Sequence, residues 1–205
     1  MKIIGIVGGV ASGKSFVAEC FRELGAVALD GDRVGHEVLL LPEVEEAVHR
    51  RWGDPVFTEE GHIDRRQLGK IVFAEGEEGR RELEFLESLT HGRIGERLAA
   101  EADRLRQKDA VPAAIIDAPV LLKAGWDDIC DEIVFVDTPL EQRLERAKTR
   151  GWDAEELDRR ERAQLSLDTK RERASTVIDN SRSREETRQR VREYWERIVD
   201  VGENA

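Results

Sequence analysis

Eight consecutive residues near the start of the chain have the types and spacing that bind a polyphosphate. They fit the pattern G-x-x-x-x-G-K-[ST] of a P-loop. They are Gly8, Gly9, Val10, Ala11, Ser12, Gly13, Lys14 and Ser15. The glycines allow a tight turn that brings backbone N–H groups against phosphate oxygens. Lys14 adds a compact charge near the β- and γ-phosphates, and the Ser15 hydroxyl can ligate Mg²⁺. The alternative is a chance glycine-rich turn.

The flanking residues supply the context that this motif needs. The run from Lys2 to Val7 is short, continuous and apolar, which predicts a strand buried on both faces. After the loop, apolar residues recur at helical spacing from Phe16 to Leu24, and Gly25 offers a stop. Strand, glycine loop and helix together favour a site for a nucleoside triphosphate with Mg²⁺.

Two acidic positions follow later predicted strands. The apolar run 26–29 ends in Asp30-Gly31-Asp32, and a polar group at the carboxyl end of a parallel strand faces the ligand crevice. We interpret Asp32 as the carboxylate that accepts or orients the proton of an attacking hydroxyl; Asp30 is the weaker candidate. The alternative for Asp32 is a helix N-cap. The run 113–117 ends in Asp117, which can reach Mg²⁺ directly or through water. No Glu follows it to activate water, which disfavours an ATP-hydrolysing motor.

Between these strands the pattern is helical from Pro42 to about Leu105, with breaks at 53–55 and 60–61. This block is too long for a plain crossover, and we interpret it as a helical insertion that covers an acceptor substrate. Arg65 and Arg66 beside a turn, and His91 in a helical stretch, are its candidate binding residues. Solvated arginines and a packed histidine are the alternatives.

The last third of the chain predicts two more strands and a basic helical segment. The runs 133–136 and 176–180 are the strands, and Thr138 is placed to cap the helix after the first. Arginines and lysines are concentrated from 143 to 173, which suits a lid over a triphosphate, although a solvated face is the alternative for any one of them. Ser183 to Glu186 forms a capping box, and the final helix has an apolar stripe.

Composition limits the classes of partner. The 205 residues carry a formal net charge of −11, which argues against nucleic acid or an anionic membrane as partner. The two cysteines match no metal or redox spacing, so we expect small buried side chains and a reducing cytoplasm. No apolar run has the length of a membrane span.

Taken together, the motifs resemble the dephospho-CoA kinase family, P-loop kinases similar to nucleoside monophosphate kinases, along nearly the full length of the chain. The matching segments, beyond the P-loop with Ile6 and Val7, are Leu29 to Asp32 with His36, Gly61 to Arg65 with Val72-Phe73, Leu86 to His91, Asp117 to Leu122, Val136 to Pro139, Arg160 with Gln164, and Val177 to Asn180.

The resemblance implies an α/β P-loop kinase fold in one domain. A five-stranded parallel sheet sandwiched by helices forms the core (1–32, 111–140 and 174–205), with a helical CoA-binding insertion at about 33–110 and a helical lid at about 141–173. It implies that ATP, with Mg²⁺, phosphorylates the ribose 3′-hydroxyl of dephospho-CoA, giving CoA and ADP in the last step of CoA synthesis. We expect a cytoplasmic enzyme and favour a monomer.

Residue roles carry over where the motifs match. Asp32 and Lys14 are assigned to catalysis, Asp32, Arg65 and His91 to the acceptor, and Ser15 to the metal. The residues assigned to nucleotide binding are Gly8, Gly9, Val10, Ala11, Ser12, Gly13, Lys14, Ser15, Phe16, Arg146, Arg150 and Asn180.

The chain departs from the family pattern at a few positions. Phe16 stands where Thr is usual, and we expect little effect. Gly92 replaces a Pro after His91, which should loosen a helix start there. Lys123 replaces a Glu. The alternative functions are another small-molecule P-loop kinase, with a nucleotide or sugar-acid acceptor, or a nucleotide-binding switch without transfer.

Overall fold

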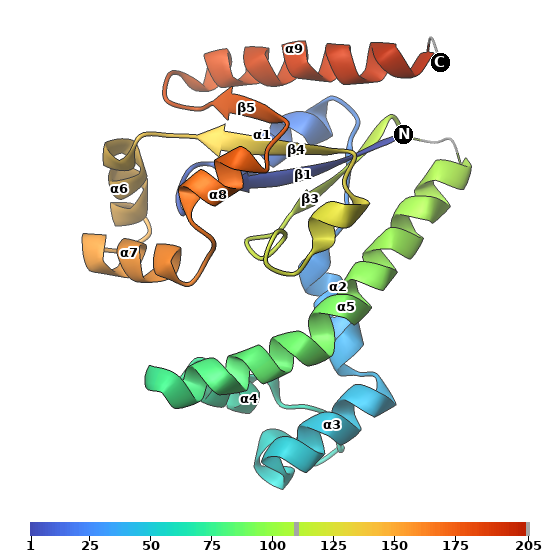
Figure 1. Ribbon diagram of the computed structural model, residues 1–205, viewed down its shortest axis with the longest axis vertical. Helices are drawn as coiled ribbons and strands as arrows, with labels where there is room; N and C mark the ends of the chain where they lie inside the picture. Colours follow the sequence, from blue (N-terminus) through green and yellow to red (C-terminus); the bar gives the residue numbers. More distant parts are fainter. Residues whose placement is uncertain (109–110, 204–205) are drawn as a thin grey trace. The chain divides into compact units, whose positions relative to one another are not determined.

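The computed structural model describes residues 1–108 and 111–203 (Figure 1). The chain forms two compact units. Unit 1 contains residues 1–30 and the described residues from 99 onward, and unit 2 is Gly31–Leu98. Unit 2 overlaps the stretch interpreted as an insertion. The predicted end of that stretch, near residue 110, lies outside the described residues. The role of the stretch in binding the acceptor stays a prediction.

A five-stranded sheet forms the centre of unit 1, as predicted. Its strands are β1 (Lys2–Gly8), β2 (Val27–Ala28), β3 (Ala113–Asp117), β4 (Glu132–Asp137) and β5 (Thr176–Asp179). They lie in the order β2-β3-β1-β4-β5, and every pairing is parallel. β2 is shorter than the predicted run 26–29, although the Leu29 N–H still donates to the Ile115 carbonyl oxygen at 2.8 Å.

The order of the strands explains where a ligand would bind. β1 lies between β3 and β4, with Ile6 paired to Asp117 and Gly8 paired to Val136. The order of the strands reverses at β1, and such a switch point leaves a crevice at the carboxyl ends of the strands. The P-loop leaves β1 at this point.

Unit 1 also contains several helical segments. They are α1 (Lys14–Glu23), η2 (Trp126–Ile129), α6 (Leu140–Lys148), α7 (Ala154–Arg162), α8 (Leu167–Glu172) and α9 (Arg184–Glu203), with the end of α5 (Gly76–Lys108). α1 and α9 bury one face, where Phe21 meets Tyr194 edge-on at 6.0 Å between ring centroids. The predicted α9 stripe and the capping box, in which Ser183 and Glu186 exchange hydrogen bonds, are confirmed.

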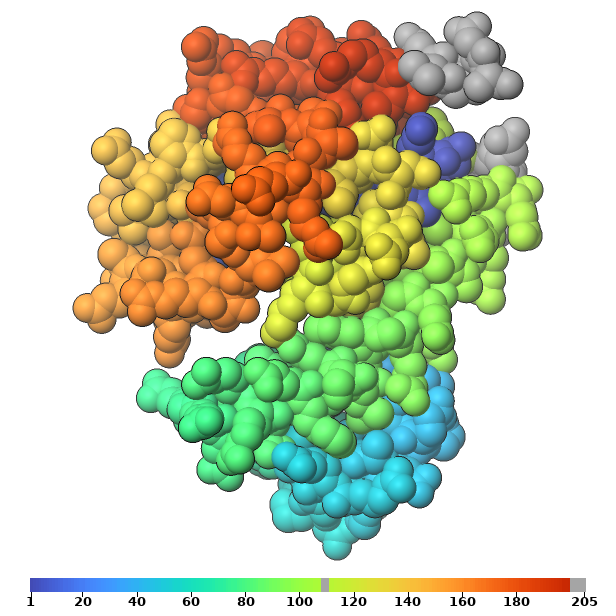
Figure 2. All heavy atoms as spheres, viewed as in Figure 1, coloured from blue at the N-terminus to red at the C-terminus, as the bar shows by residue number. Residues whose placement is uncertain are grey.

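The opposite face of the sheet is covered by the segment after β3 and by α8. Ile4 and Ile6 belong to the α1–α9 core, and Gly5 between them faces the other way. A Cβ on Gly5 would lie 3.0 Å from Leu121 Cδ1, so this glycine permits close packing. α8 contacts β1 on this side, and Figure 2 shows α7 and α8 (orange) beside the segment after β3 (yellow).

Unit 2 is helical, as the periodicity predicts. Its segments are α2 (Gly31–Leu39), α3 (Pro42–Trp52), η1 (Asp54–Val56), α4 (Arg65–Val72) and the first part of α5. An unpredicted break separates α4 from α5. The end of α3 is fixed to α5 by Glu82, which accepts hydrogen bonds from Trp52 Nε1 at 2.8 Å and from Arg51 Nη2 at 2.7 Å. Among the described residues, no helix is long and apolar enough to cross a membrane.

Candidate active site

The backbone between β1 and α1 has the conformation of a phosphate-binding loop. Gly13, directly before α1, has φ +91°, and Ala11 has φ +59°. Among the described residues, Ala11 is the only non-glycine with a positive φ. A side chain in the left-handed region costs free energy, and such strain is concentrated at functional sites. This conformation of Ala11 could not be predicted from the sequence, because alanine rarely adopts a positive φ.

Two glycines of the loop lie close against side chains from distant segments. A Cβ on Gly13 would lie 2.3 Å from Asn180 Nδ2, and one on Gly9 would lie 2.8 Å from Arg143 Nη1. Any larger residue would displace these side chains. The glycines therefore bring the loop against Arg143 of α6 and against Asn180, which follows β5, in addition to letting the loop turn.

One carbonyl of the loop is held by three side chains from distant segments. The Ser12 carbonyl oxygen accepts hydrogen bonds from Thr138 Oγ1 at 2.8 Å, Arg146 Nη1 at 2.9 Å and Asn180 Nδ2 at 2.7 Å. The structure thus brings Arg146 and Asn180, both predicted at the nucleotide site, to the P-loop. The Asn180 amide oxygen also accepts from Thr187 Oγ1 at 2.9 Å, so this buried side chain is fixed at both ends.

The prediction that Thr138 caps α6 is wrong. The N-cap of α6 is Pro139, and no side-chain hydrogen bond caps it. The Thr138 hydroxyl instead donates to Ser12 and, at 3.4 Å, to the Asn180 carbonyl oxygen. A buried hydroxyl takes the acceptor that tertiary packing offers, and here it joins the P-loop to the end of β5.

Replacing Thr138 by valine should lower the free energy of unfolding by about 0.5–1.5 kcal/mol, because one buried hydrogen bond is lost while the Ser12 carbonyl keeps its other two donors. Urea unfolding at 25 °C measures this. The matched control is Thr149→Val, since the Thr149 hydroxyl is exposed and bonds only its own helix, at Arg146 O. Equal losses in both variants would contradict a role for Thr138 as a long-range tie.

Lys14 lies over the carbonyls at the end of β1. Its Nζ donates to Gly9 O at 2.9 Å and to Gly8 O at 3.4 Å. Burial lowers the pKa of Lys14, and the charge of Asp117, at the end of the neighbouring strand, opposes this shift. Lys14 and Asp117 are therefore within electrostatic reach of each other, as a phosphate site with a metal requires.

An ion pair in which the arginine is buried contacts the loop at Val10. Arg143 is 4% exposed, and its Nη1 lies 2.5 Å from Glu161 Oε1, which also accepts from the Val10 N–H at 3.2 Å. The sequence left open that any one lid arginine is solvated. The structure excludes a solvated side chain for Arg143. The only feature of the sequence that favours its burial is weak: Arg143 lies one turn before Ala147, which is buried.

Arg150 and Phe16 reach the site less directly. Arg150 is exposed, with its guanidinium 5.5 Å from the centroid of the Trp152 ring, and its charge lowers the pKa of Lys14 through space. Phe16, in the first turn of α1, packs under Arg184, whose guanidinium carbon lies 4.3 Å from the centroid of the Phe16 ring.

The residues present fit Mg²⁺. Ser15 is exposed at the start of α1, and Asp117 ends the strand beside β1. Among the described residues, no group of three or more His, Cys, Asp or Glu could hold a metal ion by itself. Mg²⁺ is usually held by one or two protein oxygens with substrate phosphates, which this sparse set suits.

The acceptor-side residues all belong to unit 2. Asp32 is exposed in the first turn of α2, inside the helix, so the N-cap alternative is wrong. His36 lies one turn further along, and its Nδ1 is 3.3 Å from Arg65 Nη1. His36 therefore connects Arg65 to α2, the helix that also carries Asp32. The sequence did not assign His36 a place in the site.

His91 lies on α5, one turn before Ile94. A Cβ on Gly35 of α2 would lie 3.5 Å from Ile94 Cδ1, so this part of α5 packs against α2. The prediction that Gly92 loosens a helix start is wrong, because α5 continues unbroken through His91 and Gly92. The family pattern predicted that a helix begins near Gly92, but α5 begins at Gly76.

Comparisons with known proteins point to one family. The family model for dephospho-CoA kinase matches residues 2–186. The dephospho-CoA kinase of Symbiobacterium thermophilum is 38% identical over 199 residues, covering 95% of this chain and 80% of that protein. The solved structure of TT1252 from Thermus thermophilus has a TM-score of 0.74 and 33% identity, covering 94% of this chain and 95% of that one.

The dephospho-CoA kinase structure from Campylobacter jejuni has a TM-score of 0.64 at 22% identity, covering 97% of this chain and 98% of that one. At 22% identity, this structural similarity supports the fold alone, which is the P-loop kinase fold predicted from the sequence. The family model spans most of the chain, and the relative from Symbiobacterium thermophilum is similar over nearly all of it. This chain belongs to the dephospho-CoA kinase family.

Proposed function

We propose that this chain carries out the reaction of its family, transfer of the γ-phosphoryl group of ATP to the ribose 3′-hydroxyl of dephospho-CoA, giving CoA and ADP, through the P-loop of unit 1. The observation that carries the proposal is the strained loop at the sheet's switch point in a chain that belongs to this family. Phosphoryl transfer needs positioning and charge stabilisation more than covalent chemistry, and the loop supplies both.

The donor side is built from the loop and the segments that hold it. Backbone N–H groups at the start of α1 and the Lys14 ammonium bind the phosphate oxygens. Arg146 and Asn180 hold the Ser12 carbonyl, so their role in nucleotide binding includes keeping the loop in shape. Arg146 also adds positive charge where the transferring group becomes more negative.

Ser15, with Asp117 directly or through water, would hold the Mg²⁺ that accompanies ATP. When bound, the metal ion neutralises charge on the β- and γ-phosphates. The role of Ser15 is thus to hold the triphosphate in register with Lys14.

On the acceptor side, Asp32 accepts or orients the proton of the ribose hydroxyl. Arg65, and His91 on α5, bind the acceptor. The contact between Arg65 Nη1 and His36 Nδ1 supports a shared binding surface on α2 and α4. Dephospho-CoA carries a diphosphate, and an exposed guanidinium suits phosphate oxygens well.

The direct test is ADP release from Mg²⁺-ATP with and without dephospho-CoA, with product identification. Strong stimulation by dephospho-CoA, with CoA formed, supports the proposal. ATP binding without stimulation would contradict the acceptor assignment and favour another small-molecule acceptor. We further propose that the enzyme acts as a monomer in the cytoplasm, a compartment in which its two cysteines, free in this structure, stay reduced.

Replacing Arg65 by alanine should raise the KM for dephospho-CoA by about 10-fold or more, because a charge-assisted hydrogen bond is lost, and should leave the KM for ATP unchanged. Steady-state kinetics with each substrate varied measures this. The matched control is Arg66→Ala, an equally exposed arginine on the same turn of α4. If the two variants behave alike, Arg65 has no specific role in binding the acceptor.

A further inference from the structure

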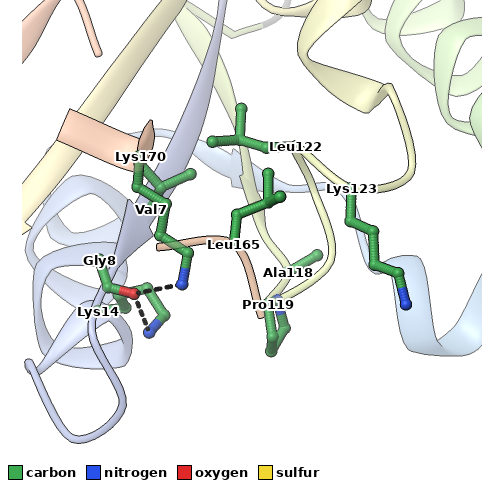
Figure 3. Close-up of a pocket in the computed structure, with 9 residues that line it drawn as sticks. All are labelled: Val7, Gly8, Lys14, Ala118, Pro119, Leu122, Lys123, Leu165 and Lys170. Atoms are coloured by element: carbon green, nitrogen blue, oxygen red, sulfur yellow. Dashed lines mark hydrogen bonds between the residues drawn. The ribbon is translucent and has the colours of Figure 1, made fainter. Parts of the chain in front are cut away.

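A second lysine reaches the same P-loop carbonyl as Lys14. Lys170, on α8, is 5% exposed, and its Nζ donates to Gly8 O at 3.3 Å and to Gln164 Oε1 at 2.7 Å. Lys14 Nζ donates to the same Gly8 oxygen at 3.4 Å. Figure 3 shows the two ammonium groups converging on this oxygen from α1 and from α8.

Both lysines line a pocket at the carboxyl end of β1. Its wall includes Gly8, Pro119 and Leu122, and Lys123 lies on the far side, with its side chain directed away from the other two lysines (Figure 3). Arg146 and Asn180 contact the other end of the loop, at Ser12. Lys170 therefore belongs to the end of the loop where the P-loop lysine serves the β- and γ-phosphates.

The charges around Lys170 favour an anion. The described charged groups that act on it are Lys14 from α1, Arg143 from α6 and Glu161 from α7. The Glu161 carboxylate is already engaged by Arg143 at 2.5 Å and by the Val10 N–H. The other acidic group nearby is Asp117, which acts on Lys14, so Lys14, Lys170, Arg143 and Arg150 outnumber the two carboxylates. Buried cations that outnumber their anionic partners are poorly compensated. Phosphate oxygens would supply them.

Burial lowers the pKa of Lys170 to about 8, and the nearby Lys14 charge adds to the shift. Lys170 is therefore mainly protonated at pH 7 and loses its charge a little above that pH. Bound phosphate would favour the charged form, so the affinity for an anion at this position should fall as the pH rises through 8.

We propose that Lys170 is a second catalytic lysine, whose ammonium exchanges the Gly8 carbonyl for the γ-phosphoryl oxygens of the bound nucleoside triphosphate, beside Lys14. The exchange places two cations where charge accumulates during transfer. This inference deepens the proposed function and rests on its nucleotide half, triphosphate binding at the P-loop.

The test compares two nucleotides in the full-length protein, without acceptor. Lys170→Met keeps the aliphatic stem and removes the charge. Calorimetric titration with Mg²⁺ and a non-hydrolysable ATP analogue should show about 10- to 100-fold weaker binding, because a charge-assisted hydrogen bond to the γ-phosphoryl group is lost. Binding of ADP, which lacks that group, should change less than about twofold by the same reasoning. Equal losses for both nucleotides would make Lys170 a support of the loop and overturn the proposal.

Two further variants make the result specific. Lys148→Ala removes an exposed lid lysine that pairs with Glu145, and it should alter neither affinity. Lys170→Arg keeps the charge and should retain most of the preference for the ATP analogue. Its affinity should also stay constant between pH 7 and pH 9, where the wild type weakens. A wild-type-like pH dependence in Lys170→Arg would assign the titration to another group, such as Lys14, and contradict the proposal.

These measurements are independent of the acceptor. If the wild type binds the ATP analogue but forms no CoA, the proposed acceptor fails and the Lys170 inference can still hold. If CoA forms normally but Lys170→Met loses no preference for the ATP analogue over ADP, the Lys170 inference alone fails.

Discussion

Replacing Asp32 by asparagine is expected to lower the turnover number by about 10²- to 10⁴-fold, the range for loss of a positioned proton acceptor. Asparagine keeps the size and polarity of the side chain but cannot accept the proton of the ribose hydroxyl. Asp32 is exposed in the first turn of α2, where its charge is not needed for packing. The fold and the affinity for ATP should therefore be unchanged.

The measurement is steady-state CoA formation, with ATP affinity determined separately by titration. The matched control is Asp30→Asn, the neighbouring carboxylate, which belongs to unit 1. A large loss in the Asp32 variant and a small one in the Asp30 variant support the assignment. The opposite order would transfer the role to Asp30, and near-normal turnover in both would remove an aspartate base from the mechanism.

Replacing Lys14 by methionine is expected to lower turnover by about 10²- to 10³-fold, the range for loss of one preorganised donor at the transition state. ATP should also bind at least about 10-fold more weakly, because a charge-assisted hydrogen bond to phosphate disappears. Unlike the loss expected in the Asp32 variant, this one should affect both binding and turnover, since the proposed role of Lys14 is to contact the donor before and during transfer.

The stability of the Lys14 variant separates a role in binding from a role in folding. Burial lowers the pKa of Lys14, so the folded protein disfavours its charged form, and removing the charge should not reduce the free energy of unfolding. Urea unfolding measures this directly. A marked loss of stability would mean that the bonds from Nζ to Gly8 O and Gly9 O support the fold, and unchanged nucleotide affinity would contradict the assigned role.

Much of the fold follows from local sequence patterns. The run 113–117 forms β3 with the predicted bounds, and the predicted capping box forms between Ser183 and Glu186. Both patterns depend on residues only a few positions apart in the sequence. The P-loop is likewise a local motif of strand, glycines and helix. Its presence determines the nucleotide chemistry, and the matching motifs along the chain indicate the family.

Tertiary structure alone decided which basic and polar side chains serve the loop. Thr138, Arg143 and Lys170 have ordinary local contexts for a cap or a solvated helical face, yet each is buried at the P-loop. Lys170 meets a carbonyl 162 residues away, and Val10 meets Glu161 across 151 residues. A helical pattern indicates which residues share a face of the helix. Whether a charged side chain on that face is buried depends on which distant segments pack against it. The sequence by itself therefore determined the strands, the loop and the family. The second lysine and the three hydrogen bonds to the Ser12 carbonyl became visible only when distant segments were packed together.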